Sequence, residues 1–176
     1  MLIIVCAMIP SSIILPQQDL SHSIVQLNSN WQIQGLLMSS LLFGPQIGIT
    51  CAISYLMIGL FYLPVFHGGG SFGYILTHEF GYLLGFIPAA WTCGYLSKIK
   101  RNANLINYSL FTVLALCILH LTGILYLIFG KILGIWIDSL SSLILINTIL
   151  PFPSQLLLCL SISLISLFLK RILLIK

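Results

Sequence analysis

Long apolar runs, separated by short polar or proline-containing breaks, make up most of this chain. A helix at the surface of a soluble protein carries a polar face, so uninterrupted apolar runs are typical of helices surrounded by lipid. The pattern predicts an all-α integral membrane protein, a single domain over residues 1–176, with six transmembrane helices. The expected helices cover residues 1–15, 33–43, 47–63, 80–96, 105–129 and 156–169.

The ends of this pattern are less regular than its middle. The first run has no basic residue at its start, which favours a membrane helix over a cleaved signal peptide. The first two runs are shorter than the roughly 20 residues of a full span. Residues 17–32 are polar and predict a loop at the membrane surface, and residues 132–150 predict an interfacial or partly inserted helix that Asp138 could cap at Ser139.

Composition excludes a soluble protein. The chain is 59% hydrophobic and 6% charged, with a mean hydropathy of +1.12, whereas soluble domains carry roughly 25% charged residues. The net charge of +4 comes from few residues, which argues against nucleic-acid binding. The five cysteines stand singly without a CxxC motif, so we expect buried thiols rather than a metal site or disulfides.

The basic residues predict a topology. Lysine and arginine concentrate on the cytoplasmic side of membrane proteins, and here they form two clusters: Lys98, Lys100 and Arg101, then Lys170, Arg171 and Lys176. Placing both clusters in the cytoplasm puts both termini there as well. Residues 17–32, the loop before residue 80 and residues 130–154 then lie outside.

A glycine-rich loop interrupts the apolar pattern before residue 80. Gly68, Gly69, Gly70 and Gly73 allow close backbone approach, so this loop is a candidate lid or pocket wall. Small residues spaced four apart flank it, at Gly44, Gly48 and Ala52 and again at Gly81, Gly85 and Ala89. Such faces let membrane helices pack closely, and we expect packing to be the role of most of these glycines.

Polar residues inside apolar segments are the candidates for a binding site, because they are costly at membrane depth. His78-Glu79 begins like the zinc-peptidase motif HExxH, but Tyr82 stands at the position of the motif's second histidine, so the second metal ligand is missing. The sequence also shows no nucleophile paired with a base. The chain is therefore predicted not to be an enzyme. Glu79 also suits the N-terminus of a helix, and His120 suits a hydrogen bond inside the bundle. The predicted ligand-binding residues are Gln34, Phe66, Gly69, Gly70, His78, Glu79, Tyr82 and Gln155.

Three sequence elements occur together in the middle of the chain. They are G-P-Q-I-G from residue 44, L-P-V-F-H-G-G from residue 63 and G-Y-L-L-G-F from residue 81. As a set they resemble the BioY family, the biotin-specific substrate-binding components of energy-coupling-factor transporters. The resemblance is dense over residues 31–97 and weaker over 105–170.

The resemblance implies a multi-pass protein of the cytoplasmic membrane that binds biotin in an outward-side pocket capped by the first and third outer loops. It further implies a transmembrane coupling subunit and two cytoplasmic ATPase subunits as partners. The chain has no P-loop, so it would need no cofactor of its own and its partners would hydrolyse ATP.

The chain departs from the family at its last helix. Similar proteins carry an acid and a lysine there that contribute to the biotin site, and this chain has Gln155 and Leu158 at those places. His78 and Glu79 are additions to the family pattern. Two alternatives therefore stay open: the same scaffold with another small vitamin-like ligand, and a structural membrane subunit without a transport role.

Overall fold

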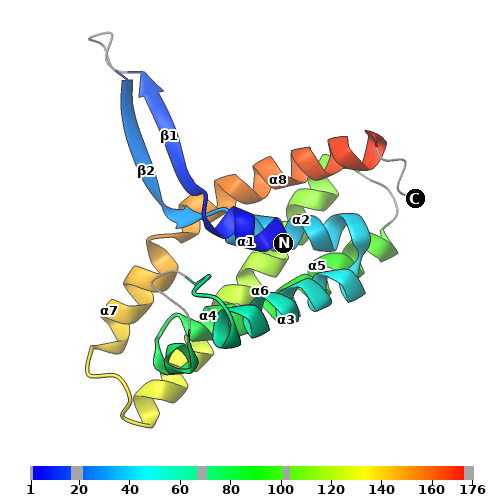
Figure 1. The fold of residues 1–176 in the computed structure, drawn as a ribbon. Helices are drawn as coiled ribbons and strands as arrows, with labels where there is room; N and C mark the ends of the chain where they lie inside the picture. The colour runs from blue at the N-terminus through cyan, green and yellow to red at the C-terminus, as the bar shows by residue number, and fades with distance from the viewer. Residues whose placement is uncertain (1, 17–21, 67–70, 101–103, 173–176) are drawn as a thin grey trace.

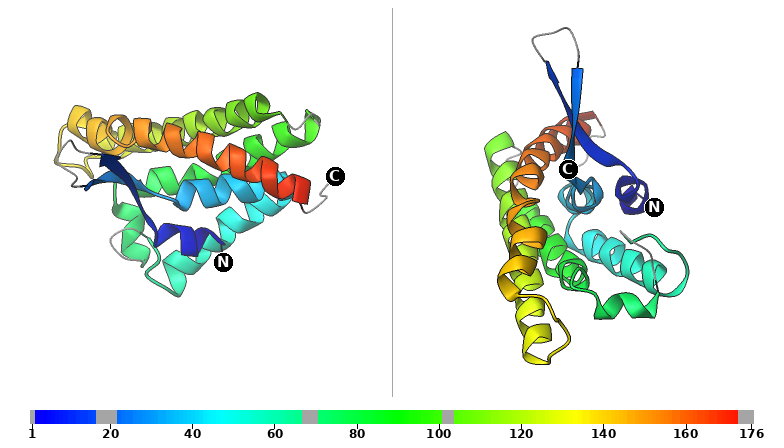
Figure 2. Two further views of the ribbon diagram at one scale, coloured as in Figure 1. Left: turned by 90° about the horizontal axis from the view of Figure 1, so that it is seen from above. Right: turned by 90° about the vertical axis from the view of Figure 1, so that its left-hand side faces the viewer.

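The computed structural model describes residues 2–16, 22–66, 71–100 and 104–172, with the backbone alone from residue 10 to residue 30. Helices make up most of this part, and the longer ones run side by side as a bundle (Figures 1 and 2). The bundle helices are α2 (Gln32–Phe43), α3 (Pro45–Phe61), α5 (Phe86–Ile99), α6 (Leu105–Ile132) and α8 (Phe152–Ile172). Shorter helical turns join them: α1 (Leu2–Ala7), the 3-10 helix η1 (Phe72–Leu76), α4 (Phe80–Leu84), α7 (Leu140–Ile144) and the π-helix η2 (Leu145–Ile149).

The apolar runs after residue 32 are helical as predicted, with three differences. The run over 80–96 forms two helices, α4 and α5, that meet at Gly85. The predicted interfacial segment forms α7 and η2, which lead into α8, and Ser139 rather than Asp138 caps α7 by accepting a hydrogen bond from the Ser142 amide. Two described stretches, α6 and Leu140–Ile172, are long and apolar enough to cross a membrane.

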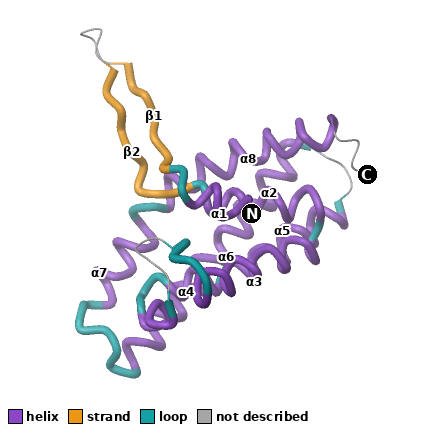
Figure 3. Tube along the Cα trace, viewed as in Figure 1, coloured by secondary structure: helices purple, strands orange, loops and turns teal. Residues whose placement is uncertain are grey.

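The prediction was only partly right for the first 30 residues, because the helix expected over residues 1–15 is present only over Leu2–Ala7. The first helix stops at Ala7, and the strands β1 (Pro10–Pro16) and β2 (His22–Asn30) form an antiparallel hairpin that projects from the bundle (Figure 3). Proline disrupts a helix interior, so Pro10 ends the helical run. β-branched residues favour strands, and the register pairs Ile13 with Val25. The described part of the fold is thus mostly helical, as predicted, with one hairpin within its first 30 residues.

Described residues of both basic clusters lie at one end of the bundle (Figure 1). Lys170, near the end of α8, donates a hydrogen bond of 3.0 Å to the hydroxyl of Tyr108 at the start of α6. The side chain of Lys98, in the last turn of α5, lies against Gly44, which joins α2 to α3 with a φ of +89°. The described basic residues Lys98 and Lys170 thus lie at the same end of the bundle, which is consistent with the predicted topology.

Glycines permit the closest contacts between helices. A Cβ added to Gly94 of α5 would lie 2.5 Å from the backbone nitrogen of Pro45 at the start of α3. Gly81 of α4 lies against the Tyr126 side chain, and Gly85, which follows α4, lies against Thr122, so these glycines leave room for the side chains of α6. These contacts are the close helix packing that the small-residue spacing predicted.

Replacement of Gly94 by alanine tests this packing. Because the added methyl group would meet backbone atoms, we expect Gly94→Ala to lower the stability by about 1–3 kcal/mol, the usual cost of overpacking. Thermal unfolding of the detergent-purified protein measures the effect. Gly73→Ala is the matched control, because a Cβ at Gly73 meets only the Ser71 hydroxyl oxygen, at 3.5 Å. Equal melting temperatures of the two variants would contradict the packing account.

Candidate ligand-binding site

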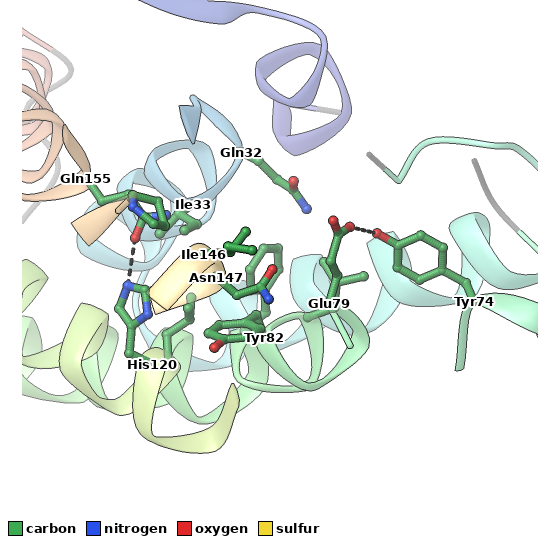
Figure 4. A pocket seen from close by; sticks show the side chains of 13 residues that line it. Gln32, Ile33, Tyr74, Glu79, Tyr82, His120, Ile146, Asn147 and Gln155 are labelled. Carbon is green, nitrogen blue, oxygen red and sulfur yellow. Dashed lines mark hydrogen bonds between the residues drawn. The ribbon is translucent and has the colours of Figure 1, made fainter. Parts of the chain in front are cut away.

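A cavity of about 320 Å³ lies at the end of the bundle away from the basic clusters, where α6 and α8 meet η1, α4 and η2 (Figure 4). This volume is within the range of small-molecule sites. Its wall combines polar side chains with apolar ones from seven elements and the turns between them. The lining residues are Gln32, Ile33, Tyr74, Glu79, Tyr82, Leu83, Phe86, Leu119, His120, Ile146, Asn147, Pro151 and Gln155.

A neutral pair of side chains, His120 of α6 and Gln155 of α8, forms the buried side of the cavity. The two residues are 4% and 8% exposed, and His120 Nε2 lies 2.8 Å from Gln155 Oε1. The rings of Phe152 and Tyr82 stand edge-on to the imidazole at 5.3 and 5.8 Å. His120 Nδ1 is buried and has no hydrogen-bond partner among the described residues.

The hydrogen bond between His120 and Gln155 leaves one donor and one acceptor unused. With Gln155 Oε1 as acceptor, the imidazole carries its proton on Nε2, so Nδ1 is a free acceptor and the amide N–H₂ a free donor. If the amide group is rotated by 180°, its nitrogen donates to Nε2 and the imidazole proton lies on Nδ1, so Nδ1–H is the free donor and Oε1 the free acceptor. Either way, the His120–Gln155 pair offers a complementary donor and acceptor without a net charge.

Tyr82 forms the wall between the two ends of the cavity. Its hydroxyl lies 2.7 Å from Thr148 Oγ1 in η2, and its ring covers Gly123 of α6. Any Cβ at residue 123 would overlap this ring. The absence of a side chain at Gly123 in α6 therefore lets the ring of Tyr82, from α4, occupy this part of the cavity wall.

An acidic group marks the opposite end. Figure 4 places Glu79 and Tyr74 on one side of the cavity and the His120–Gln155 pair on the other, with Tyr82 and Asn147 between them. The Tyr74 hydroxyl donates a hydrogen bond to Glu79 Oε2. Burial and this hydrogen bond raise the pKa of Tyr74 above its ordinary value, so the hydroxyl remains a donor. Among the described lining residues, Glu79 is the one acidic side chain, and none is a lysine or an arginine.

The predicted site residues divide into three groups. Glu79, Tyr82 and Gln155 line the cavity. Gln34, Phe66 and His78 lie outside its lining: Gln34 is fully buried, Phe66 packs on Tyr55 and Gly59, and the His78 ring stands 6.3 Å from that of Trp136. Gly69 and Gly70 fall outside the described residues.

Sequence reasoning missed several lining residues. Gln32, Tyr74 and Asn147 come from segments that were predicted as loop or interfacial, so no periodicity indicated where they point. His120 was expected to form a hydrogen bond inside the bundle, and it does so with Gln155. Its place in the cavity follows only from packing α6 against α8.

Comparison with models of protein families shows to which family the chain belongs. The model of the BioY family matches residues 1–174. The chain belongs to the BioY family. The resemblance of its sequence elements is thereby confirmed, and the family is one of membrane transport components rather than enzymes.

Two individual proteins are also similar to this chain. The chain is 32% identical over 111 residues to a protein of Lysinibacillus sphaericus named as a probable biotin transporter BioY; the match covers 63% of this chain and 56% of that protein. It is 23% identical over 149 residues, 85% of this chain and 77% of the other, to an uncharacterized 21.2 kDa protein of Cyanophora paradoxa. Only a little over half the length of the Lysinibacillus protein is therefore matched.

The fold of this BioY-family chain also has a solved counterpart. The crystal structure of the S-component for biotin from an ECF-type ABC transporter superposes with a TM-score of 0.72 at 21% identity, over 96% of this chain and 85% of that one. At this identity, the similarity establishes the fold.

The His120–Gln155 pair yields a stability prediction that does not depend on any ligand. We expect Gln155→Leu to destabilise the protein by about 1–3 kcal/mol, because it leaves buried imidazole nitrogens without partners. Adding His120→Leu removes both polar partners, so the double variant should recover much of that loss. Thermal unfolding of the single and double variants measures this. Additive losses in the double variant would show that the pair is not coupled.

Proposed function

We propose that this BioY-family chain is the substrate-binding component of a biotin uptake system and that the cavity holds the ligand. The observation that carries the proposal is a buried, uncharged donor and acceptor pair at one end of a cavity with polar and apolar walls, in a chain of this family. The named functions of the Lysinibacillus protein and of the solved S-component support the choice of biotin.

The polar and apolar parts of biotin match the polar and apolar parts of the cavity wall. Its ureido group presents a carbonyl acceptor beside N–H donors, which complements the free donor and acceptor of the His120–Gln155 pair. Its thioether ring and aliphatic chain suit the apolar surfaces of Tyr82, Leu83 and Phe86. Gln155 stands at the place where the family resemblance implies an acid that contributes to the biotin site, and here Gln155 contacts the head group together with His120.

Burial gives the ligand a direction. His120 and Gln155 are nearly inaccessible, whereas Glu79 is partly exposed. Burying an ionised carboxylate without a cationic partner is costly, and no lysine or arginine lines the described part of the cavity. The uncharged bicyclic head therefore binds against His120 and Gln155, and the carboxylate tail extends toward Glu79.

The remaining elements of the proposal concern the membrane and the partners. The bundle helices cross the cytoplasmic membrane, the end that carries Lys98 and Lys170 faces the cytoplasm, and the cavity opens outward at the opposite end. A transmembrane coupling subunit and two ATPase subunits supply the energy, and the chain needs no cofactor of its own. Gly69 and Gly70 belong to the loop proposed as a lid.

Equilibrium binding of labelled biotin to the detergent-purified protein tests the function, with unlabelled thiamine and riboflavin as competitors. We expect saturable binding that neither competitor displaces. No binding by well-folded protein would contradict the biotin assignment. Displacement by one of the two vitamins would favour the same scaffold with another ligand.

The double variant His120→Leu/Gln155→Leu tests the site. It removes every polar group of the head contact, so we expect biotin affinity to fall at least about tenfold, the equivalent of one lost buried hydrogen bond. Gln46→Leu makes the same amide-to-leucine change on the exposed face of α3 and should bind as the native protein does. Unchanged affinity in the folded double variant would place the ligand elsewhere.

A further inference from the structure

The cavity carries one charge that a free carboxylate would meet. Glu79 lines the cavity at the end opposite the His120–Gln155 pair. The side chains labelled around it in Figure 4 (Tyr74, Tyr82, Asn147 and Gln32) bear no positive charge. In the proposed orientation, the tail of biotin points toward this carboxylate without a described cation to offset it.

Hydrogen bonding fixes what Glu79 can accept. The Tyr74 hydroxyl already donates to Oε2, and the other oxygen, Oε1, accepts no hydrogen bond from the described residues. A carboxylate has acceptors only, so Glu79 can bind a donor and repels a second carboxylate. Gln32, whose Nε2 is buried without a described partner, adds a free N–H donor nearby for a carbonyl oxygen.

We infer that Glu79 selects ligands whose tail ends in an amide rather than in a free carboxylate, so that biotinyl amides bind this protein more tightly than biotin. The amide N–H donates to Glu79 Oε1, and the amide carbonyl accepts from Gln32. Both contacts use groups that have no described partner in the empty cavity. The inference rests on the proposed function, since it assumes that the bicyclic head lies against His120 and Gln155.

The arrangement makes Glu79 a specificity-determining residue. A like charge across a binding site mainly penalises the wrong ligand. Solvent reaches Glu79 in part and screens this penalty. Glu79 therefore discriminates between ligands with a carboxylate tail and ligands with an amide tail, whereas the His120–Gln155 pair at the opposite end provides affinity for the shared head group.

The test compares three ligands that share the head group: biotin, its primary amide and its methyl ester. For the native protein we expect the amide to bind about tenfold more tightly than biotin, as for a partly screened like charge. The ester lacks both the charge and the donor, so its affinity should lie between the two. In Glu79→Gln, which still accepts from Tyr74, biotin should gain affinity and the amide-to-biotin ratio should approach one.

Two controls separate charge from shape. Glu79→Asp keeps the negative charge and should keep the preference for the amide, and Asp138→Asn removes an exposed acid outside the cavity and should change neither affinity. Native protein that binds biotin as tightly as the amide would overturn the inference. Equal weakening of all three ligands by Glu79→Gln would also overturn it, because Glu79 would then contact the shared head. If the native protein bound none of the three, the proposed function itself would be wrong, and the inference would fall with it.

Discussion

The close approach of α4 to α6 is the contact on which the site depends. Gly81 and Gly85 bring α4 against Tyr126 and Thr122, and Gly123 receives the ring of Tyr82. In lipid, helices gain little from the hydrophobic effect between them, so such backbone proximity is a main source of packing energy. A larger residue at any of these glycines would separate the helices and displace Tyr82, the wall between the two polar ends of the cavity.

Gln155 and Leu158 stand where the family resemblance implies an acid and a lysine, and the structure shows where each of them lies. Leu158 is buried outside the cavity lining, so the position gives no charge to the site. Gln155 instead bonds to His120, and a buried amide–imidazole pair avoids the desolvation cost of two buried charges. In this chain the buried end of the cavity is therefore polar without an acid or a lysine, and Glu79 lies at the less buried end.

Apolar runs predicted the helices after residue 32 because each is bounded by proline, glycine or charge, as at Pro45 and Lys98. The helix predicted over residues 1–15 is mostly absent because the prediction relied on apolar content alone. Pro10 and the β-branched residues of this segment favour the hairpin over a helix. In the site, Glu79, Tyr82 and Gln155 were predictable as polar residues at helix starts. Gln32 and Asn147 were not, since their place in the cavity depends on tertiary packing alone.

A structure of the protein with biotin bound tests the central claim most directly. The account predicts the ureido group within hydrogen-bond distance of both His120 and Gln155, with the tail running past Tyr82 toward Glu79. A ligand bound in the reverse direction, with its ureido group on Glu79, or bound outside this cavity, would contradict it.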